Sequence, residues 1–196
     1  MTLLDAAVAA LTAWSVPSAA QDRLREDYLA HLAAHPDGLW RDGPPAHLTA
    51  SCAVLDPAGQ HVLLTHHAKA GVWVQFGGHL ETSDADLAAA ALREAREESG
   101  VPDVVLVPGG PVDLHRHTLS AAFGRCREHL DVLYAGVAAA DAVPVVSDES
   151  HDVAWWPVDA LPAGTVADLP ARLAAVVAAV RGYARAVDAS DAASRA

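Results

Sequence analysis

One stretch of this chain, residues 72 to 101, restricts the fold more than any other, because it joins a strand, a glycine pair and a helix in close succession. Val72 to Phe76 is rich in β-branched and aromatic residues, which favour a strand. Gly77 and Gly78 are then expected to break the strand. Glycine at such a point lets the backbone approach a ligand or a metal closely.

The helix that follows is predicted to span residues 84 to 99. Ser83 is the expected N-cap, and the carboxylates of Asp84 and Asp86 suit the positive end of the helix dipole. Gly100 supplies the C-terminal stop. At helical spacing, one arc of small or apolar side chains can face a core. This arc consists of Ala88, Ala91, Leu92, Ala95 and Ser99.

An adjacent arc of the same helix carries Glu94, Glu97 and Glu98 within one turn of one another. Three carboxylates this close repel each other, which makes each one harder to keep ionised. A divalent cation among them removes the penalty, and ligands made only of oxygen suit Mg²⁺ or Mn²⁺. Arg93 lies beside Glu97 on the helical wheel and can hold it in position. The alternative interpretation is a solvated, charged helix face.

The rest of the chain surrounds this segment with further elements. Helices are predicted over 2 to 14, 18 to 35 and 170 to 187, and strands over 48 to 55, 61 to 65, 103 to 107, 111 to 117, 129 to 137 and 152 to 156. The first two strands form a hairpin, and residues 1 to 40 are expected to pack on the main domain. This places a helical extension at 1 to 40, a main domain at 41 to 187 and a flexible tail at 188 to 196.

Composition excludes several classes of partner. The chain has a formal net charge of -12, which is poorly suited to binding a phosphate backbone, so no bulk nucleic acid is expected. The two cysteines, Cys52 and Cys126, give no disulfide framework. Met1 to Ala20 lacks the basic region of a signal peptide, and no apolar run reaches the length of a membrane span. The prediction is a cytoplasmic protein without a membrane partner.

These motifs resemble those of a known family. Gly77-Gly78-His79-Leu80-Glu81, followed by the segment from Arg93 to Val101, is similar to the signature of the Nudix hydrolases. The second half matches every fixed position, and the likeness extends over residues 47 to 187. The resemblance implies an α/β/α sandwich with a mixed β-sheet, carrying the N-terminal helical extension. One departure is Asp84, which stands where the family usually has glutamate, in a loop that is one residue longer.

The resemblance also implies roles for individual residues. Glu94, Glu97 and Glu98 would ligate Mg²⁺, with Mn²⁺ as an alternative ion, and the carbonyl of Gly78 would supply another ligand. Arg93 would orient a glutamate. The implied activity is hydrolysis of a diphosphate linkage in a nucleoside diphosphate derivative or a similar organic diphosphate, with Glu97 and Glu98 among the catalytic residues.

A carboxylate must remove a proton from the attacking water. A helix glutamate could do this, and so could an acid from the segment before the last predicted strand, where Glu149 is preferred over Asp148, although an acidic surface turn explains Glu149 equally well. His115 and His117 alternate along one strand and so point to one face of it. Together with His129 on a neighbouring strand they could line the substrate cleft or form a metal site, and a hairpin face that happens to carry histidines explains them equally well. No role is assigned to these histidines.

Three functional hypotheses compete. A diphosphate hydrolase acting on a small molecule ranks first. A non-catalytic Nudix-fold ligand sensor ranks second, since such a protein should have lost the helix glutamates. An isopentenyl-diphosphate isomerase-like enzyme ranks third, because Cys52 lacks the context of a catalytic cysteine. His79 is expected to be exposed and Cys126 to have no function. No sequence motif identifies the substrate. The sequence is compatible with a homodimer.

Overall fold

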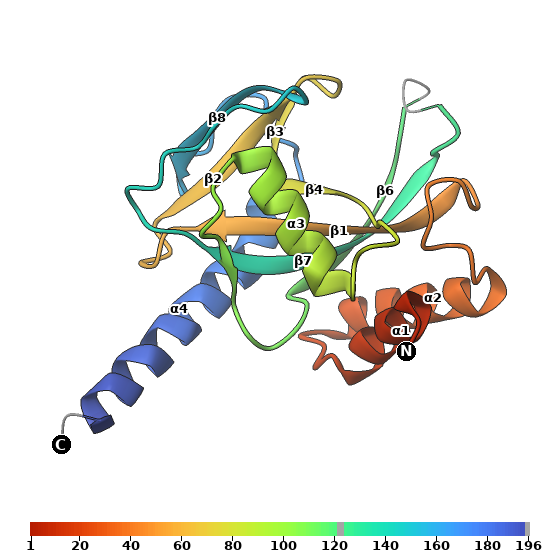
Figure 1. The fold of residues 1–196 in the computed structure, drawn as a ribbon, viewed down its shortest axis with the longest axis horizontal. Coiled ribbons are helices and arrows are strands. Elements are labelled where there is room, and N and C mark those ends of the chain that lie inside the picture. Colours follow the sequence, from red (N-terminus) through yellow and green to blue (C-terminus); the bar gives the residue numbers. More distant parts are fainter. Residues whose placement is uncertain (121–123, 195–196) are drawn as a thin grey trace.

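The computed structural model describes residues 1–120 and 124–194 and is built around one mixed sheet of eight strands. The strands are β1 (Ala46–Leu55), β2 (His61–His67), β3 (Val72–Val74), β4 (Phe76–His79), β5 (Val105–Leu106), β6 (Asp113–Thr118), β7 (Glu128–Val137) and β8 (Ser150–Pro157). The helices are α1 (Leu3–Ala13), α2 (Ala19–Ala34), α3 (Leu87–Ser99) and α4 (Leu169–Ser194). Figure 1 shows their arrangement.

Strands β1 and β7 form the centre of the sheet and run parallel over their full length. Every other pairing is antiparallel, including the predicted hairpin of β1 and β2, which is confirmed. Strand β1 also pairs with β4, and β7 with β6. The first half of β1 therefore lies between β7 and β4, and β6 lies on the other side of β7.

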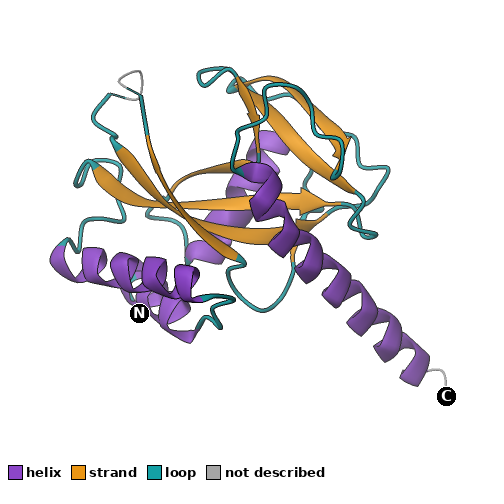
Figure 2. Ribbon diagram, turned by 180° about the vertical axis from the view of Figure 1, so that it is seen from behind, coloured by secondary structure: helices purple, strands orange, loops and turns teal. Residues whose placement is uncertain are grey.

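The two faces of β1 are covered by different helices, as Figures 1 and 2 show from opposite sides. One face packs with α3 into a core that includes Leu48, Ala50, Cys52 and Val54. The other face packs with α4, through Ala53 and Leu55. Alternation along the strand places His47, Thr49 and Ser51 on this second face. Polar residues thus occupy the beginning of the α4 face, and a hydrophobic core occupies its end.

The N-terminal helices extend the core on the α3 side. Tyr28 and Leu32 of α2 and Leu11 of α1 belong to the same hydrophobic cluster as α3. The Tyr28 hydroxyl donates to the Asp131 carbonyl at 3.3 Å, and the Gln21 amide donates to the Asp113 carboxylate at 2.8 Å. The expectation that this region packs on the main domain without a core of its own is confirmed. Whether residues 1 to 40 act as a separate extension stays a prediction.

Several predicted boundaries differ from the structure. Gly77 and Gly78 do not break the strand but lie inside β4, because β1 supplies hydrogen-bonding partners that a local pattern cannot show. The N-cap of α3 is Asp86, whose carboxylate accepts from the Ala89 N–H at 2.8 Å, and not Ser83. Asp84 instead accepts from the Glu81 N–H at 2.7 Å and holds a turn before the helix.

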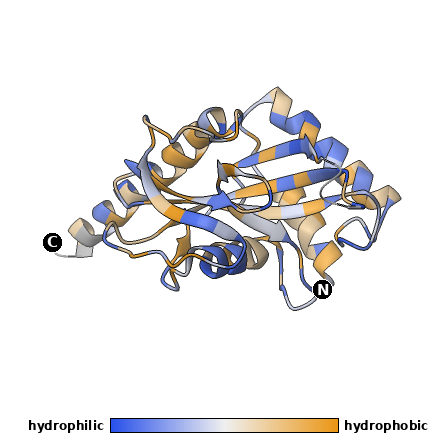
Figure 3. Cartoon of the chain, turned by 90° about the horizontal axis from the view of Figure 1, so that it is seen from above, coloured by the Kyte–Doolittle hydropathy of each residue, from blue (hydrophilic) through white to orange (hydrophobic). Residues whose placement is uncertain are grey.

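The elements nearer the C-terminus also shift. The strand predicted over 103 to 107 shortens to β5, which pairs with β7 only at Val105 and Leu106. Helix α4 continues to Ser194, since its alanine-rich end contains no strong helix breaker. The flexible tail predicted over 188 to 196 stays a prediction. Figure 3 shows hydrophobic and hydrophilic residues alternating along the strands. None of the described helices is both long and apolar enough to span a bilayer.

Candidate metal and substrate site

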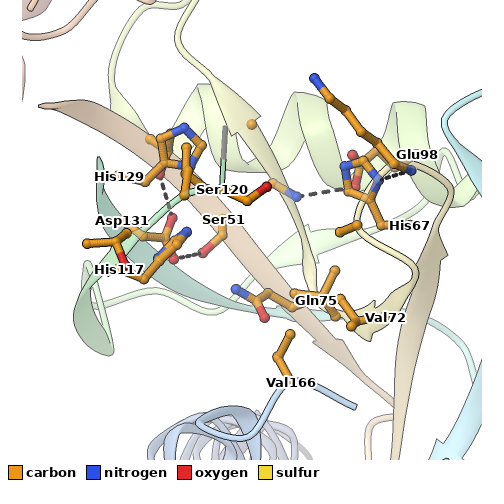
Figure 4. A pocket seen from close by; sticks show the side chains of 18 residues that line it. Ser51, His67, Val72, Gln75, Glu98, His117, Ser120, His129, Asp131 and Val166 are labelled. Atoms are coloured by element: carbon orange, nitrogen blue, oxygen red, sulfur yellow. Dashed lines mark hydrogen bonds between the residues drawn. The ribbon is translucent and has the colours of Figure 1, made fainter. Parts of the chain in front are cut away.

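Strand β4 lies between two adjoining cavities of about 350 and 620 Å³. Both cavities are bordered by Gly77, Gly78, Glu98, His67 and His129. The larger one also reaches Glu94 and Glu149, and Figure 4 shows the smaller one from close by. The glycine pair and Glu98 therefore border both cavities, and Glu94 borders the larger one.

Two of the predicted glutamates meet the glycine strand directly. Glu98 is buried, and its carboxylate accepts from the Gly77 N–H at 3.2 Å. Glu94 lies against Gly78, where an added Cβ would be 2.7 Å from the Glu94 Oε1. A side chain at position 78 would displace this carboxylate, so the close approach requires glycine.

The carboxylates are held where their charge is poorly solvated. Burial raises the pKa of Glu98 to about 8, with Glu94, Glu149 and Glu97 adding repulsion and the Gly77 hydrogen bond opposing the shift. Burial also raises the pKa of Glu94, although Arg93 opposes this. A cation between the two carboxylates would remove the repulsion. The donors are all oxygen, so these residues fit Mg²⁺ or Mn²⁺.

Arg93 connects the glutamates of α3 to the segment that precedes the helix. Its guanidinium donates to both oxygens of the Asp84 carboxylate at 3.0 Å and to the carbonyl of His79 at 3.0 Å. It also donates to Glu94 at 2.9 Å and to Glu97 at 3.1 Å. Asp84 is thus a buried partner of Arg93 and not a member of the cavity wall.

The remaining predicted residues, Glu97 and Glu149, are exposed. The Glu97 side chain is 62% exposed and borders neither cavity, since Arg93 draws it aside. Glu149 is exposed and borders the larger cavity with Asp148. The Glu149 carbonyl accepts from the Ala68 N–H at 2.8 Å, which ties its backbone to the end of β2. The structure brings Gly78, Glu94, Glu98 and Glu149 to one cavity and leaves Glu97 beside it.

Comparison with known proteins decides the family. The family model described as NUDIX domain matches residues 45–178, which is more than half of the chain. The chain belongs to the Nudix family. The predicted family and fold are therefore confirmed. A search of curated proteins gives no match.

Solved Nudix structures share this fold. A hydrolase of the NUDIX family from Clostridium perfringens aligns with a TM-score of 0.54 at 21% identity, covering 68% of this chain and 95% of its own. A MutT NUDIX hydrolase from Burkholderia pseudomallei gives 0.51 at 23%, covering 67% and 98%. A C. elegans Ap4A hydrolase gives 0.53 at 16%, covering 69% and 98%. The prediction of a Nudix enzyme agrees with these names at the level of the family.

Residues that the sequence analysis missed form the floor of the smaller cavity of this Nudix domain. Asp131 is buried in β7 and accepts from Ser51 at 2.6 Å, from Thr49 at 3.1 Å and from Arg172 at 3.0 Å. Figure 4 shows Asp131 and Ser51 joined beside Gln75. The Gln75 Oε1 is buried without a hydrogen-bond partner in the described part of the chain. A lone aspartate within an apolar strand was the available signal for Asp131.

Histidines fill the other end of the polar face. His115 and His117 do share a face, and His117 pairs with His129 across β6 and β7. His79 was expected to be exposed, but its ring packs 5.1 Å from that of His47 and 5.2 Å from that of His129. Burial, with added repulsion from neighbouring histidines, lowers the pKa of His79 to about 4 and that of His129 to about 3.

Proposed function

We propose that this Nudix protein is a Mg²⁺-dependent hydrolase that cleaves the diphosphate linkage of a nucleoside diphosphate derivative or a similar organic diphosphate. The observation that carries the proposal is the contact of Glu94 with Gly78 and of Glu98 with the Gly77 N–H, on the wall of a cavity of about 620 Å³. Mutually repelling, poorly solvated carboxylates at an open cavity suit a site that binds a cation together with an anionic ligand.

In this proposal, Glu94, Glu98 and the Gly78 carbonyl hold the metal, and Glu97 is the additional ligand or catalytic group implied by the family. When bound, Mg²⁺ would neutralise the diphosphate charge and make the attacking water more acidic. Arg93 positions Glu94 through its 2.9 Å hydrogen bond. A rotation that brings Glu97 into the cavity would break its 3.1 Å contact with Arg93.

Glu149 is the proposed general base. It borders the same cavity as Glu94 and Glu98, and its charge contributes to raising the pKa of both. Because the side chain is exposed, it can exchange the abstracted proton with solvent. Its backbone is fixed through the Ala68 hydrogen bond, which keeps the carboxylate at the rim of the site.

The smaller cavity would take the organic part of the substrate. Its polar groups include Asp131, Ser51, Thr49 and Gln75. The unpaired Oε1 of Gln75 is an acceptor that a donor on a nucleobase or a sugar could satisfy. Valines 72, 74 and 166 border the same space and offer an apolar surface for a ring.

The test is a screen of nucleotide sugars, dinucleotides and nucleoside triphosphates with Mg²⁺ and with Mn²⁺, read by chromatography of the products. At least one substrate class is expected to be hydrolysed, and Glu98→Gln and Glu149→Gln should lose that activity. Glu26→Gln, an exposed change on α2, is the matched control. Inactivity of the native protein towards every class would instead favour a ligand sensor. A cytoplasmic location and a homodimer remain predictions. Cell fractionation tests the location, and light scattering tests the oligomeric state.

A further inference from the structure

A second group of potential metal ligands lies beside the glycine strand, apart from the glutamates. It consists of His47, His79, Cys126 and His129, and one ligand atom from each lies within 4.8 Å of the others. The three imidazole rings have centroids 5.1 to 5.2 Å apart. We call these four residues the histidine–cysteine cluster.

The sheet register explains how distant parts of the sequence meet here. His47 of β1 is directly opposite His129 of the parallel strand β7. His79 of β4 is opposite Thr49 of β1, two residues after His47 and on the same face. Cys126 precedes β7 and reaches the same point, with its Sγ 3.9 Å from the His79 Nε2. Three strands and one loop therefore converge on a single small volume.

The hydrogen bonds of His47 indicate which of its nitrogens faces a ligand. The Nδ1 contacts the Pro44 carbonyl at 3.1 Å, and a carbonyl can only accept, so Nδ1 carries the proton. The Nε2 then has a free lone pair, although the residue is completely buried and this atom has no hydrogen-bond partner within the described ranges. A ring fixed by a backbone carbonyl, with its other nitrogen free, is the usual state of a histidine metal ligand.

His129 repeats this feature, since its Nε2 is also buried and unpaired within residues 1–120 and 124–194. Burying a polar nitrogen without a partner costs roughly 1–3 kcal/mol. Two such atoms on members of one cluster that also holds a buried cysteine are unusual in a native fold. One bound cation would satisfy these groups together.

The donor set selects the ion. Three imidazole nitrogens and one sulfur are poor ligands for Mg²⁺, which prefers oxygen, but they suit Zn²⁺ in a tetrahedral site. We propose that the histidine–cysteine cluster binds one Zn²⁺ ion, separately from the glutamate site. Four protein ligands leave no open position, so the site is structural.

The position of the cluster gives it a role in arranging the cleft. His79 directly follows Gly78, whose carbonyl is a proposed ligand of the catalytic metal. A zinc ion holding His79 to β1 and β7 would fix the end of the glycine strand against the two central strands. It would also anchor the segment that contains Cys126 at the rim of the larger cavity. Loss of zinc is therefore expected to loosen the site without removing any of its glutamates.

The first experiment uses the full chain and two metals. Metal analysis after dialysis against Zn²⁺ and exhaustive washing should show one Zn²⁺ per chain. Replacement by Co²⁺ should produce the intense visible bands of tetrahedral coordination and a sulfur-to-cobalt charge-transfer band in the near ultraviolet. Absence of tightly held Zn²⁺, or Co²⁺ binding without a sulfur band, would overturn the proposal.

Two cysteine variants identify the sulfur ligand. Cys126→Ser should lose the charge-transfer band, whereas Cys52→Ser should retain it, because Cys52 is buried in the core on the other face of β1. If both variants kept the band, the ligand assignment would be wrong. Circular dichroism checks that each variant is folded, and His129→Gln, which should bind Zn²⁺ at least tenfold more weakly, provides an independent test.

A double variant separates this site from the catalytic one. The double change of Glu94→Gln and Glu98→Gln should leave both the Zn²⁺ content and the sulfur band unchanged while it removes Mg²⁺-dependent hydrolysis. Loss of the zinc signal in this folded variant would contradict two independent sites. Retention of zinc in an enzyme that is inactive on every substrate would support the zinc proposal and count against the hydrolase alone.

Discussion

Replacing Glu98 with Gln should stabilise the magnesium-free protein while it abolishes activity. Burial and the neighbouring glutamates raise the pKa of the Glu98 carboxyl from 4.5 to about 8. Because this pKa is higher in the folded than in the unfolded chain, the folded state is penalised as pH rises from about 4.5 towards 8. Gln keeps the shape and an oxygen acceptor for the Gly77 N–H, but it carries no charge to bury.

The magnitude follows from linkage. Near pH 7, the Glu98 carboxyl is ionised in the unfolded chain but largely protonated in the folded one. Each pH unit between the unfolded pKa of 4.5 and pH 7 lowers the free energy of unfolding by about 1.4 kcal/mol, so the native protein loses about 3 kcal/mol of stability. For a chain of this length, a free-energy difference of that size raises the melting temperature of Glu98→Gln by about 6–12 °C relative to the native protein. At a pH near 4.5, where the unfolded carboxyl is itself half protonated, the two proteins should be almost equally stable.

The assay is denaturant unfolding of both proteins in magnesium-free buffer over a series of pH values, repeated with saturating Mg²⁺. Added Mg²⁺ should stabilise the native protein much more than the variant, because only the native site has its full ligand set. Hydrolysis by the variant should fall about 100-fold or more. Glu97→Gln is the matched control, since its side chain is 62% exposed and its stability effect should stay within about 1 kcal/mol. A variant less stable than native protein near neutral pH would refute the reasoning.

Three further outcomes are expected. Asp131→Asn should destabilise the fold by about 3–5 kcal/mol in calorimetry, because it leaves the buried Arg172 guanidinium with a weakened partner 3.0 Å away. Gly78→Ala should raise the Mg²⁺ concentration needed for half-maximal activity, since the new Cβ would lie 2.7 Å from Glu94 Oε1. Mg²⁺ binding near neutral pH should release protons from Glu98, detected by calorimetry in buffers of different ionisation enthalpy, and release should diminish above a pH of about 8.

Each of these three predictions has an outcome that would contradict it. Asp168→Asn removes a more exposed carboxylate, 3.5 Å from the same arginine, and should cost less than about 1 kcal/mol. Equal losses at positions 131 and 168 would contradict a buried ion network. An unchanged Mg²⁺ requirement in Gly78→Ala would show that Glu94 moves without consequence. Binding heats that are the same in every buffer would exclude proton release.

Much of the fold was readable from local patterns. Long strands such as β7 were predicted because their β-forming side chains and turn signals are local properties. The N-terminal helices were predicted from helical spacing, and in the structure Thr2 and Ser18 cap them. The predictions failed where a distant partner decides the outcome. Gly77 and Gly78 are in a strand only because β1 pairs with them.

The sequence alone indicated the family, through the resemblance of the glycine pair and the spaced glutamates to the Nudix signature, and the helical period places Glu94 and Glu98 one turn apart on the same face. It could not establish which glutamates face the cavity. That depends on the tertiary structure, in which Arg93 pairs with Asp84 and with the exposed Glu97, and Glu97 borders neither cavity. The histidine–cysteine cluster was equally invisible, because its members are far apart in sequence and meet only through strand register. Local spacing determines what a helix can present, but only pairing between distant strands determines which side chains share a site.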